Sequence, residues 1–168
     1  MPQFETVRRV PFTPEQMYAL VADVEKYPQF LPLCESLQVI SKSPSDGGTM
    51  IVARMEIGYK AIREAFTTQV VLKPALPTVT VTYLDGPFHH LENRWRFVAA
   101  DNGAACDVGF WIDYQFKSPV LGLLMGVMFD RAFRKFSQAF EERALAVYGA
   151  PVVGAPRPGA PAGTASSA

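Results

Sequence analysis

A helix of about 29 residues near the C-terminus constrains the fold of this chain more than any other feature. Ser118 is placed to cap this helix, Pro119 suits its first position, and an amphipathic pattern then runs to about Val147. At ~1.5 Å per residue the helix spans roughly 43 Å, close to the width of a domain of this size. Such a helix cannot cover its own apolar stripe, so the rest of the chain must supply a surface of similar length.

That surface is predicted to be a β-sheet, because residues 37–116 alternate between polar and apolar with a period of two. Turn signals such as PSDGG at 44–48 divide this region into strands, and QFETVRRV at 3–10 adds a first strand. Short connections favour antiparallel pairing. We therefore predict an α+β fold of the helix-grip kind, a curved antiparallel sheet of about seven strands wrapped around the C-terminal helix.

Two short helices are predicted after the first strand. Thr13 can cap the first of them, Pro14 suits its first turn, and Gln16 can complete a capping box. In the stretch DVEKYPQFLPLC at 23–34, Pro28 and Pro32 interrupt any helix, so only one or two further turns are expected there.

The folded part is predicted to be one domain. A chain of 168 residues is long enough to bury a sizeable core. The last twenty residues, GAPVVGAPRPGAPAGTASSA, are mainly Gly, Ala, Pro and Ser and carry a single charge. We expect the domain to cover residues 1–148 and residues 149–168 to form a disordered tail.

Charge and cysteine usage narrow the functional classes. Sixteen basic residues balance sixteen acidic ones, so no large field attracts nucleic acid, and we expect no DNA partner. The N-terminus has no signal-peptide pattern, and no apolar run approaches the ~20 residues of a spanning helix. Cys34 and Cys106 have no metal-ligand spacing and are interpreted as core thiols in a reducing compartment. We expect a cytoplasmic protein, including a peripheral position at the inner membrane.

Catalytic motifs are absent from the sequence. It contains no glycine-rich phosphate loop, no G-x-S-x-G, no HExxH and no Cys-x-x-Cys. His89 and His90 are neighbours on a predicted strand, so their side chains point to opposite faces and cannot jointly hold a metal. Glu64 stands beside Arg63 and is interpreted as a structural carboxylate. We therefore predict a protein that is not an enzyme, with no catalytic residue, no metal and no cofactor.

The first and second halves of the long helix differ in the polarity of their outer faces. One stripe is apolar along its whole length and is predicted to face the core; it contains Met125, Phe129, Phe133, Phe136 and Phe140. On the opposite face, charged residues of the second half are preceded in the first half by four apolar ones: Val120, Leu123, Leu124 and Val127. Leaving these four in water forgoes about 1.5–3 kcal/mol each, so something is expected to cover them. Three covers remain open: the domain's own segment 27–34, a bilayer or partner protein, and a bound apolar ligand.

Several stretches of the chain resemble a known family. They are VADVEKYPQFLPLC at 21–34, REAFTTQV at 63–70, GPFHHLENRWRF at 86–97, and DYQFKSPVL at 113–121 with AFEERA at 139–144. In this order they are similar to the START-like superfamily, which contains polyketide cyclases, and within it to the coenzyme Q-binding protein and ribosome-association toxin family.

The resemblance implies non-enzymatic binding of a hydrophobic lipid, above all ubiquinone, in a tunnel between sheet and helix, in support of respiratory electron transfer. The quinone is then a bound ligand rather than a catalytic cofactor. We expect these residues to contact the lipid: Phe30, Leu33, Phe66, Val70, Tyr83, Leu91, Trp95, Phe110, Leu124 and Met128. The tunnel entrance or membrane contact is expected at Val120, Leu123, Leu124 and Val127, beside the segment 27–33.

Two alternatives stay open at this point. The resemblance also implies a toxin-like protein, of a toxin–antitoxin pair, that binds the large ribosomal subunit and blocks subunit association; Arg131, Arg134 and Lys135 would form the local basic patch that it needs. Some START-like relatives are cyclases or aromatases. Such an enzyme would need polar groups inside the tunnel, for which the strand pattern offers Tyr83, Asn93 and Tyr114.

Overall fold

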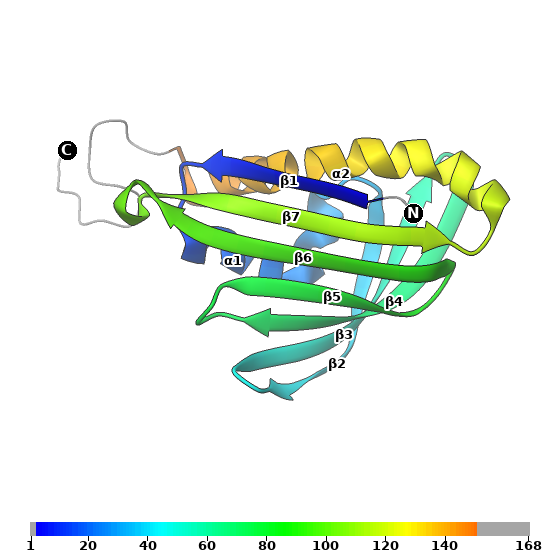
Figure 1. Cartoon of the computed structure of the whole chain (residues 1–168), viewed down its shortest axis with the longest axis horizontal. Coiled ribbons are helices and arrows are strands. Elements are labelled where there is room, and N and C mark those ends of the chain that lie inside the picture. Colours follow the sequence, from blue (N-terminus) through cyan, green and yellow to red (C-terminus); the bar gives the residue numbers. More distant parts are fainter. Residues whose placement is uncertain (1–2, 151–168) are drawn as a thin grey trace.

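A seven-stranded antiparallel sheet curves around one long helix, as the sequence predicts (Figure 1). The computed structural model describes residues 3–150, so the predicted tail lies almost wholly outside the described residues. The elements in chain order are β1 (Gln3–Val10), α1 (Pro14–Ala22), the 3-10 helix η1 (Val24–Gln29), β2 (Cys34–Ser45), β3 (Gly48–Tyr59), β4 (Ile62–Lys73), β5 (Thr78–Asp85), β6 (Phe88–Ala100), the 3-10 turn η2 (Asp101–Gly103), β7 (Ala105–Phe116) and α2 (Pro119–Tyr148).

The strand order explains how the sheet encloses the helix. Strands β2 to β7 follow one another in space as they do in sequence, whereas β1 pairs with β7 at the other edge. The β1–β7 register runs from Gln3 opposite Asp113 to Val10 opposite Cys106. The α1–η1 connection must therefore cross from one edge of the sheet to the other, and it closes the concave side together with α2 (Figure 1).

Both predicted helix starts are confirmed. In α1 the Thr13 hydroxyl accepts a hydrogen bond from the backbone N–H of Gln16 at 3.1 Å, and the Gln16 side chain accepts one from the Thr13 N–H at 2.9 Å. At α2 the Ser118 hydroxyl accepts from the Leu121 N–H at 3.1 Å. These bonds satisfy backbone donors that have no partner within the helix.

The core forms where the apolar face of each strand meets the inner stripe of α2. Along β7 every second side chain from Cys106 to Phe116 is buried, and the α2 stripe buries Met125, Phe129, Phe133 and Phe140. Aromatic rings fill much of this space. The Phe110 ring lies 4.6 Å from Trp95 between centroids, and Phe88 stacks on Phe116 at 4.7 Å.

The start of β6 departs from the predicted alternation. Strict alternation would place His89 on the same face as Leu91, but the pairing with β7 shifts between Phe88 and His90. Phe88 is fully buried in its place, and His89 is exposed. A bulge adds one residue to the strand, so the alternation reverses across it.

The segment after α1 takes a different place from the one expected. The rings of Tyr27 and Phe30 pack against Phe140 with centroid distances of 5.5 and 5.0 Å, and Arg143 donates a hydrogen bond to Gln29 at 2.7 Å. The segment therefore lies against the second half of α2. The expectation that it borders the apolar first half is wrong, because the aromatic side chains that attract it are in the second half.

Candidate functional site

An apolar cavity of about 100 Å³ lies between the concave face of the sheet and α2. Its walls come from most elements of the fold: η1, the loop that follows it, the strands β2 to β7, and the inner stripe of α2 from Phe129 to Phe140. Large rings of α2 and smaller side chains of β3, such as Ala53, both contribute to its lining.

Two of the three polar side chains in the cavity wall, Asn93 and Tyr27, form hydrogen bonds within the protein. The Asn93 Nδ2 donates to the backbone oxygen of Trp111 at 2.9 Å, and its Oδ1 accepts from the Trp95 indole N–H at 3.0 Å. The Tyr27 hydroxyl donates to the backbone oxygen of Val21, and burial raises the pKa of Tyr27. Thr68 is the other uncharged polar residue of the wall.

Charged side chains are absent from the described residues that line the cavity. An apolar wall of this kind favours a hydrocarbon and disfavours an ionic ligand, since nothing in it would compensate the lost hydration of a charge. Within residues 3–150 no group of acidic, histidine or cysteine side chains is arranged to hold a metal ion.

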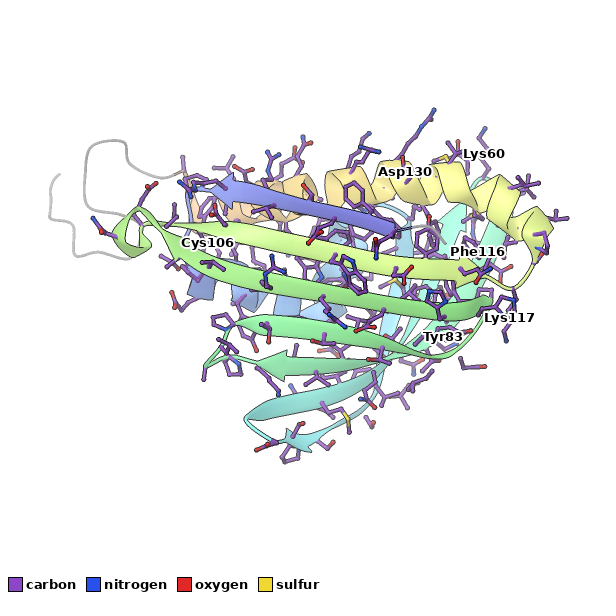
Figure 2. The ribbon with its side chains drawn as sticks, viewed as in Figure 1. Lys60, Tyr83, Cys106, Phe116, Lys117 and Asp130 are labelled. Carbon is purple, nitrogen blue, oxygen red and sulfur yellow. The ribbon has the colours of Figure 1, made fainter. Side chains whose placement is uncertain are left out.

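The two thiols lie outside the cavity lining. Burial raises the pKa of Cys34 and of Cys106 to about 12, so both are protonated and poorly nucleophilic at neutral pH. Cys106 lies at the opposite end of the sheet from Phe116 and Lys117 (Figure 2). Neither thiol therefore offers nucleophilic chemistry to a molecule in the cavity.

Five of the ten residues predicted to contact a ligand line the cavity: Leu33, Phe66, Val70, Leu91 and Trp95. Each lies on an inward face that the strand pattern indicates, or in the loop before β2. The sequence pattern placed these side chains on the correct side of the sheet.

Three further predicted contacts are packed elsewhere. Phe30 packs on Tyr27 and Phe140, and Phe110 is wedged among the rings of Trp95, Phe133 and Phe136. The hydroxyl of Tyr83, which is labelled in Figure 2, accepts from the backbone N–H of Phe88 at 3.2 Å, and the Tyr83 ring contacts the Phe88 ring. Inward direction alone does not place a side chain at a cavity when a neighbouring ring fills the space.

Leu124 and Met128 also fall outside the cavity lining. Both lie on α2 away from its inner stripe, Leu124 exposed and Met128 half-buried. Other residues line the cavity without having been predicted to do so, among them three of β3 and four rings of α2: Ala53, Met55, Ile57, Phe129, Phe133, Phe136 and Phe140. Their shared faces were visible in the sequence, but a cavity between them was not.

The apolar first half of α2 is open to solvent. We call Val120, Leu123, Leu124 and Val127 the tip cluster; their side chains are 66%, 80%, 57% and 59% exposed. The cluster occupies the first turns of α2, yellow in Figure 1, at the end of the molecule opposite the β6–β7 connection. No described segment of the chain covers it, which excludes the segment 27–34 as its cover.

Comparisons with known proteins agree with this architecture. The fold and the enclosed apolar cavity define a START-like, helix-grip protein, and a START superfamily protein from Mycobacterium smegmatis shares the fold at 20% identity with a TM-score of 0.71. The sequence profile of the family described as polyketide cyclase/dehydrase and lipid transport matches residues 10–141. The chain belongs to this family.

Nearer relatives have two kinds of name. The ribosome association toxin RatA of Escherichia coli K12 is 33% identical over 150 residues, which cover 89% of this chain and 91% of the toxin. The mitochondrial coenzyme Q-binding protein COQ10 homolog B of Xenopus laevis is 33% identical over 141 residues, 82% of this chain and 56% of that protein. CC1736 from Caulobacter crescentus, known from a solution structure, is 33% identical in sequence and superposes with a TM-score of 0.74. The match covers 89% of this chain and 100% of the CC1736 chain. These relatives confirm the predicted coenzyme Q-binding and toxin family.

Proposed function

We propose that this protein binds a prenyl lipid, with ubiquinone as the ligand, and carries it without chemical turnover in support of respiratory electron transfer. The observation that carries this proposal is the apolar cavity between sheet and α2, whose polar wall groups Asn93 and Tyr27 already have partners. The name of the COQ10 relative supports the choice of a quinone.

Cavity size limits how the ligand is held. A cavity of ~150 Å³ accepts a benzene molecule, so about 100 Å³ suits a small ring or a short piece of prenyl chain. A complete quinone with its tail therefore requires the walls to separate. The half-buried lining residues Pro32, Leu33, Leu37 and Met55 mark one side on which the cavity approaches the surface.

The cavity wall does not favour enzymatic chemistry. Of the three polar residues that the cyclase alternative requires, Tyr83 and Tyr114 are not in the lining, and the Asn93 amide bonds the protein itself. Burial, together with nearby Asp130, raises the pKa of Tyr114 to about 12, which makes it a poor base at neutral pH. A binding role therefore needs fewer assumptions than a catalytic one.

A cavity-filling variant tests the proposal without unfolding the protein. Ala53→Leu extends a buried lining side chain into the cavity and should keep or raise stability by up to about 2 kcal/mol. Ala99→Leu, an exposed position on β6, is the matched control. Parent and control are expected to carry a prenyl quinone, detected by mass spectrometry of an organic extract. Added ubiquinone should stabilise them by about 2.7 kcal/mol at one hundred times the dissociation constant.

Ala53→Leu should lose both responses to quinone. The proposal fails if no prenyl lipid is extracted from the parent and added quinone leaves its thermal melt unchanged. It also fails if Ala53→Leu binds quinone as the parent does, because the ligand then lies elsewhere.

A second function is favoured by one specific observation, the match to RatA over 91% of that toxin's length. We propose ribosome binding as the alternative, with the exposed Arg131 and Lys135 of α2 as phosphate contacts. Overexpression should then reduce the share of joined subunits in sucrose gradients, and Arg131→Gln with Lys135→Gln should restore it. An unchanged share on overexpression of the parent removes this alternative.

A further inference from the structure

The tip cluster leaves four large apolar side chains in water at one end of the molecule. Leu123 is 80% exposed, and its three companions are more than half exposed. Burying an exposed leucine is favourable by ~1.5–3 kcal/mol, so this arrangement is costly unless another surface receives it. The cluster covers two turns, about 11 Å along the helix axis.

Basic side chains continue the same face of α2 immediately after the tip cluster. With 100° per residue, Arg131 and Arg134 fall within the angular range of the cluster, and Lys135 lies beside it. We call these three residues the basic collar; all three are exposed. The acidic Asp130 lies beside the opposite edge of that range, as far outside it as Lys135, and forms an ion pair with Arg134 at 3.0 Å.

The charges of the basic collar indicate which kind of surface can receive the tip cluster. The whole chain is electrically neutral, yet this stretch presents an apolar tip followed by three cations and one carboxylate, Asp130, so that positive charge is in excess there. An amphipathic helix that binds a bilayer buries apolar residues ~5–10 Å into the interface, while Lys and Arg meet anionic headgroups. The cluster lies at the end of α2, so the helix would enter the bilayer with its tip first, and two turns of apolar side chains are then comparable with that depth.

We propose that the tip cluster inserts into the surface of an anionic bilayer, with the basic collar at the level of the lipid phosphates. Insertion is shallow, because no helix within residues 3–150 is long and apolar enough to cross a membrane. Phe129, which follows the cluster on α2, lines the cavity on the inner face of the same helix. Docking therefore brings one cavity wall close to the bilayer, but the contact itself does not depend on which ligand the cavity holds.

Two matched leucines test the apolar part. Leu123→Asp changes the tip cluster, and Leu76→Asp changes a leucine in the β4–β5 connection that is 72% exposed. The full chain is floated with vesicles of phosphatidylcholine alone and of phosphatidylcholine mixed with phosphatidylglycerol. We expect the parent and Leu76→Asp to float with the anionic vesicles, and Leu123→Asp to bind at least about tenfold more weakly. Both variants should keep the parent's thermal melt, since both positions are exposed.

Charge variants test the collar separately. Arg131→Gln and Lys135→Gln should each weaken binding to anionic vesicles about fivefold at low salt, and added salt should weaken the parent. Lys42→Gln, an exposed position on β2, should bind as the parent does.

A dye reports the depth of insertion. The native thiols Cys34 and Cys106 are buried, so an environment-sensitive dye attaches selectively to Leu123→Cys or to Leu76→Cys. Its emission should shift to the blue with anionic vesicles only at position 123.

Three outcomes overturn the proposal. One is equal binding by the parent and Leu123→Asp, and another is binding that ignores lipid charge. The third is a dimer of the parent in analytical ultracentrifugation that Leu123→Asp converts to monomer, with no flotation of either. That result would mean that the tip cluster is a dimer interface and contacts a second copy of the chain instead of a bilayer. Each of these results is independent of quinone binding, so the ligand proposal can fail or stand separately.

Discussion

Asn93 joins two strands through its side chain from inside the cavity wall. It bonds the indole of Trp95 on its own strand and the backbone oxygen of Trp111 on β7. A buried amide in an apolar wall is tolerated because both ends have partners. The same bonds hold Trp95 against Phe140, whose rings are 5.1 Å apart.

Removing this amide should destabilise the fold. Asn93→Ala leaves a buried donor and a buried acceptor without partners, at about 1–3 kcal/mol each. We expect a loss of about 2–4 kcal/mol in the free energy of unfolding, measured by urea denaturation. Gln38→Ala, which removes an exposed amide on β2, should change it by less than about 0.5 kcal/mol. A similar loss in both variants contradicts this account of Asn93.

Two phenylalanines on α2 line the cavity but differ in how deeply they are buried. Phe140 is fully buried among Tyr27, Phe30 and Trp95, so Phe140→Ala should cost about 3–5 kcal/mol in urea denaturation. Phe136 is only half-buried beside the cavity, and Phe136→Ala should cost clearly less. Equal costs would show that the smaller buried surface of Phe136 does not lower the cost of removing its ring.

At the scale of elements, α2 does two tasks with two faces. Its inner stripe supplies the aromatic wall of the cavity, and its outer face carries the tip cluster and the basic collar. The first turn of α2 must stay helical although the side chains of the tip cluster face solvent. The Ser118 cap provides this by satisfying the Leu121 N–H.

Loss of that cap should be measurable. Ser118→Ala removes the hydroxyl acceptor and should cost about 1 kcal/mol in urea denaturation, whereas Ser118→Asp retains an acceptor and should stay near the parent. Hydrogen exchange of the Leu121 amide should rise in Ser118→Ala. If Ser118→Asp is as unstable as Ser118→Ala, the hydroxyl bond is not what stabilises the helix start.

At the scale of the whole molecule, burial of weakly acidic groups links stability to alkaline pH. Burial raises the pKa of Cys34 and Cys106 from 9.0 to about 12, and that of Tyr114 from 10.0 to about 12. The unfolded chain therefore releases these protons at lower pH than the folded chain does. Stability should be unaffected by these groups below about pH 9 and should fall as pH rises from there towards 12.

Thermal melts from about pH 8 to about pH 11 check this expectation. The double variant Cys34→Ala with Cys106→Ala should show a shallower fall in melting temperature than the parent. An identical slope would mean that the thiols do not ionise differently in the folded and unfolded chain.

The helix starts and the strand faces could be predicted from the sequence because both depend on residues that are close together in the chain. Capping depends on residues three positions apart, as at Thr13 and Gln16, and strand alternation is set by the pleat, as along β7. Both therefore leave a direct trace in the sequence. The bulge at Phe88 left none, because it is fixed by pairing with β7 rather than by neighbouring residues.

The candidate site could be predicted only in part for the same reason. The alternation of polar and apolar residues predicted that Leu91, Trp95 and Phe110 all point inward. Leu91 and Trp95 line the cavity, whereas Phe110 does not. Whether an inward side chain meets a void or another ring depends on the curvature of the sheet and the position of α2. These are properties of the packed layers.

The sequence by itself determined that a long helix with one continuous apolar stripe needs an antiparallel sheet to cover it, and that the opposite face of its first half is apolar. Only the tertiary structure decided where the cavity lies and that the tip cluster stays exposed. The cluster stays exposed because the segment 27–30 lies against the second half of α2, where the rings of Tyr27 and Phe30 pack on Phe140. Periodicity is a property of neighbours along the chain, whereas coverage depends on which distant surfaces meet.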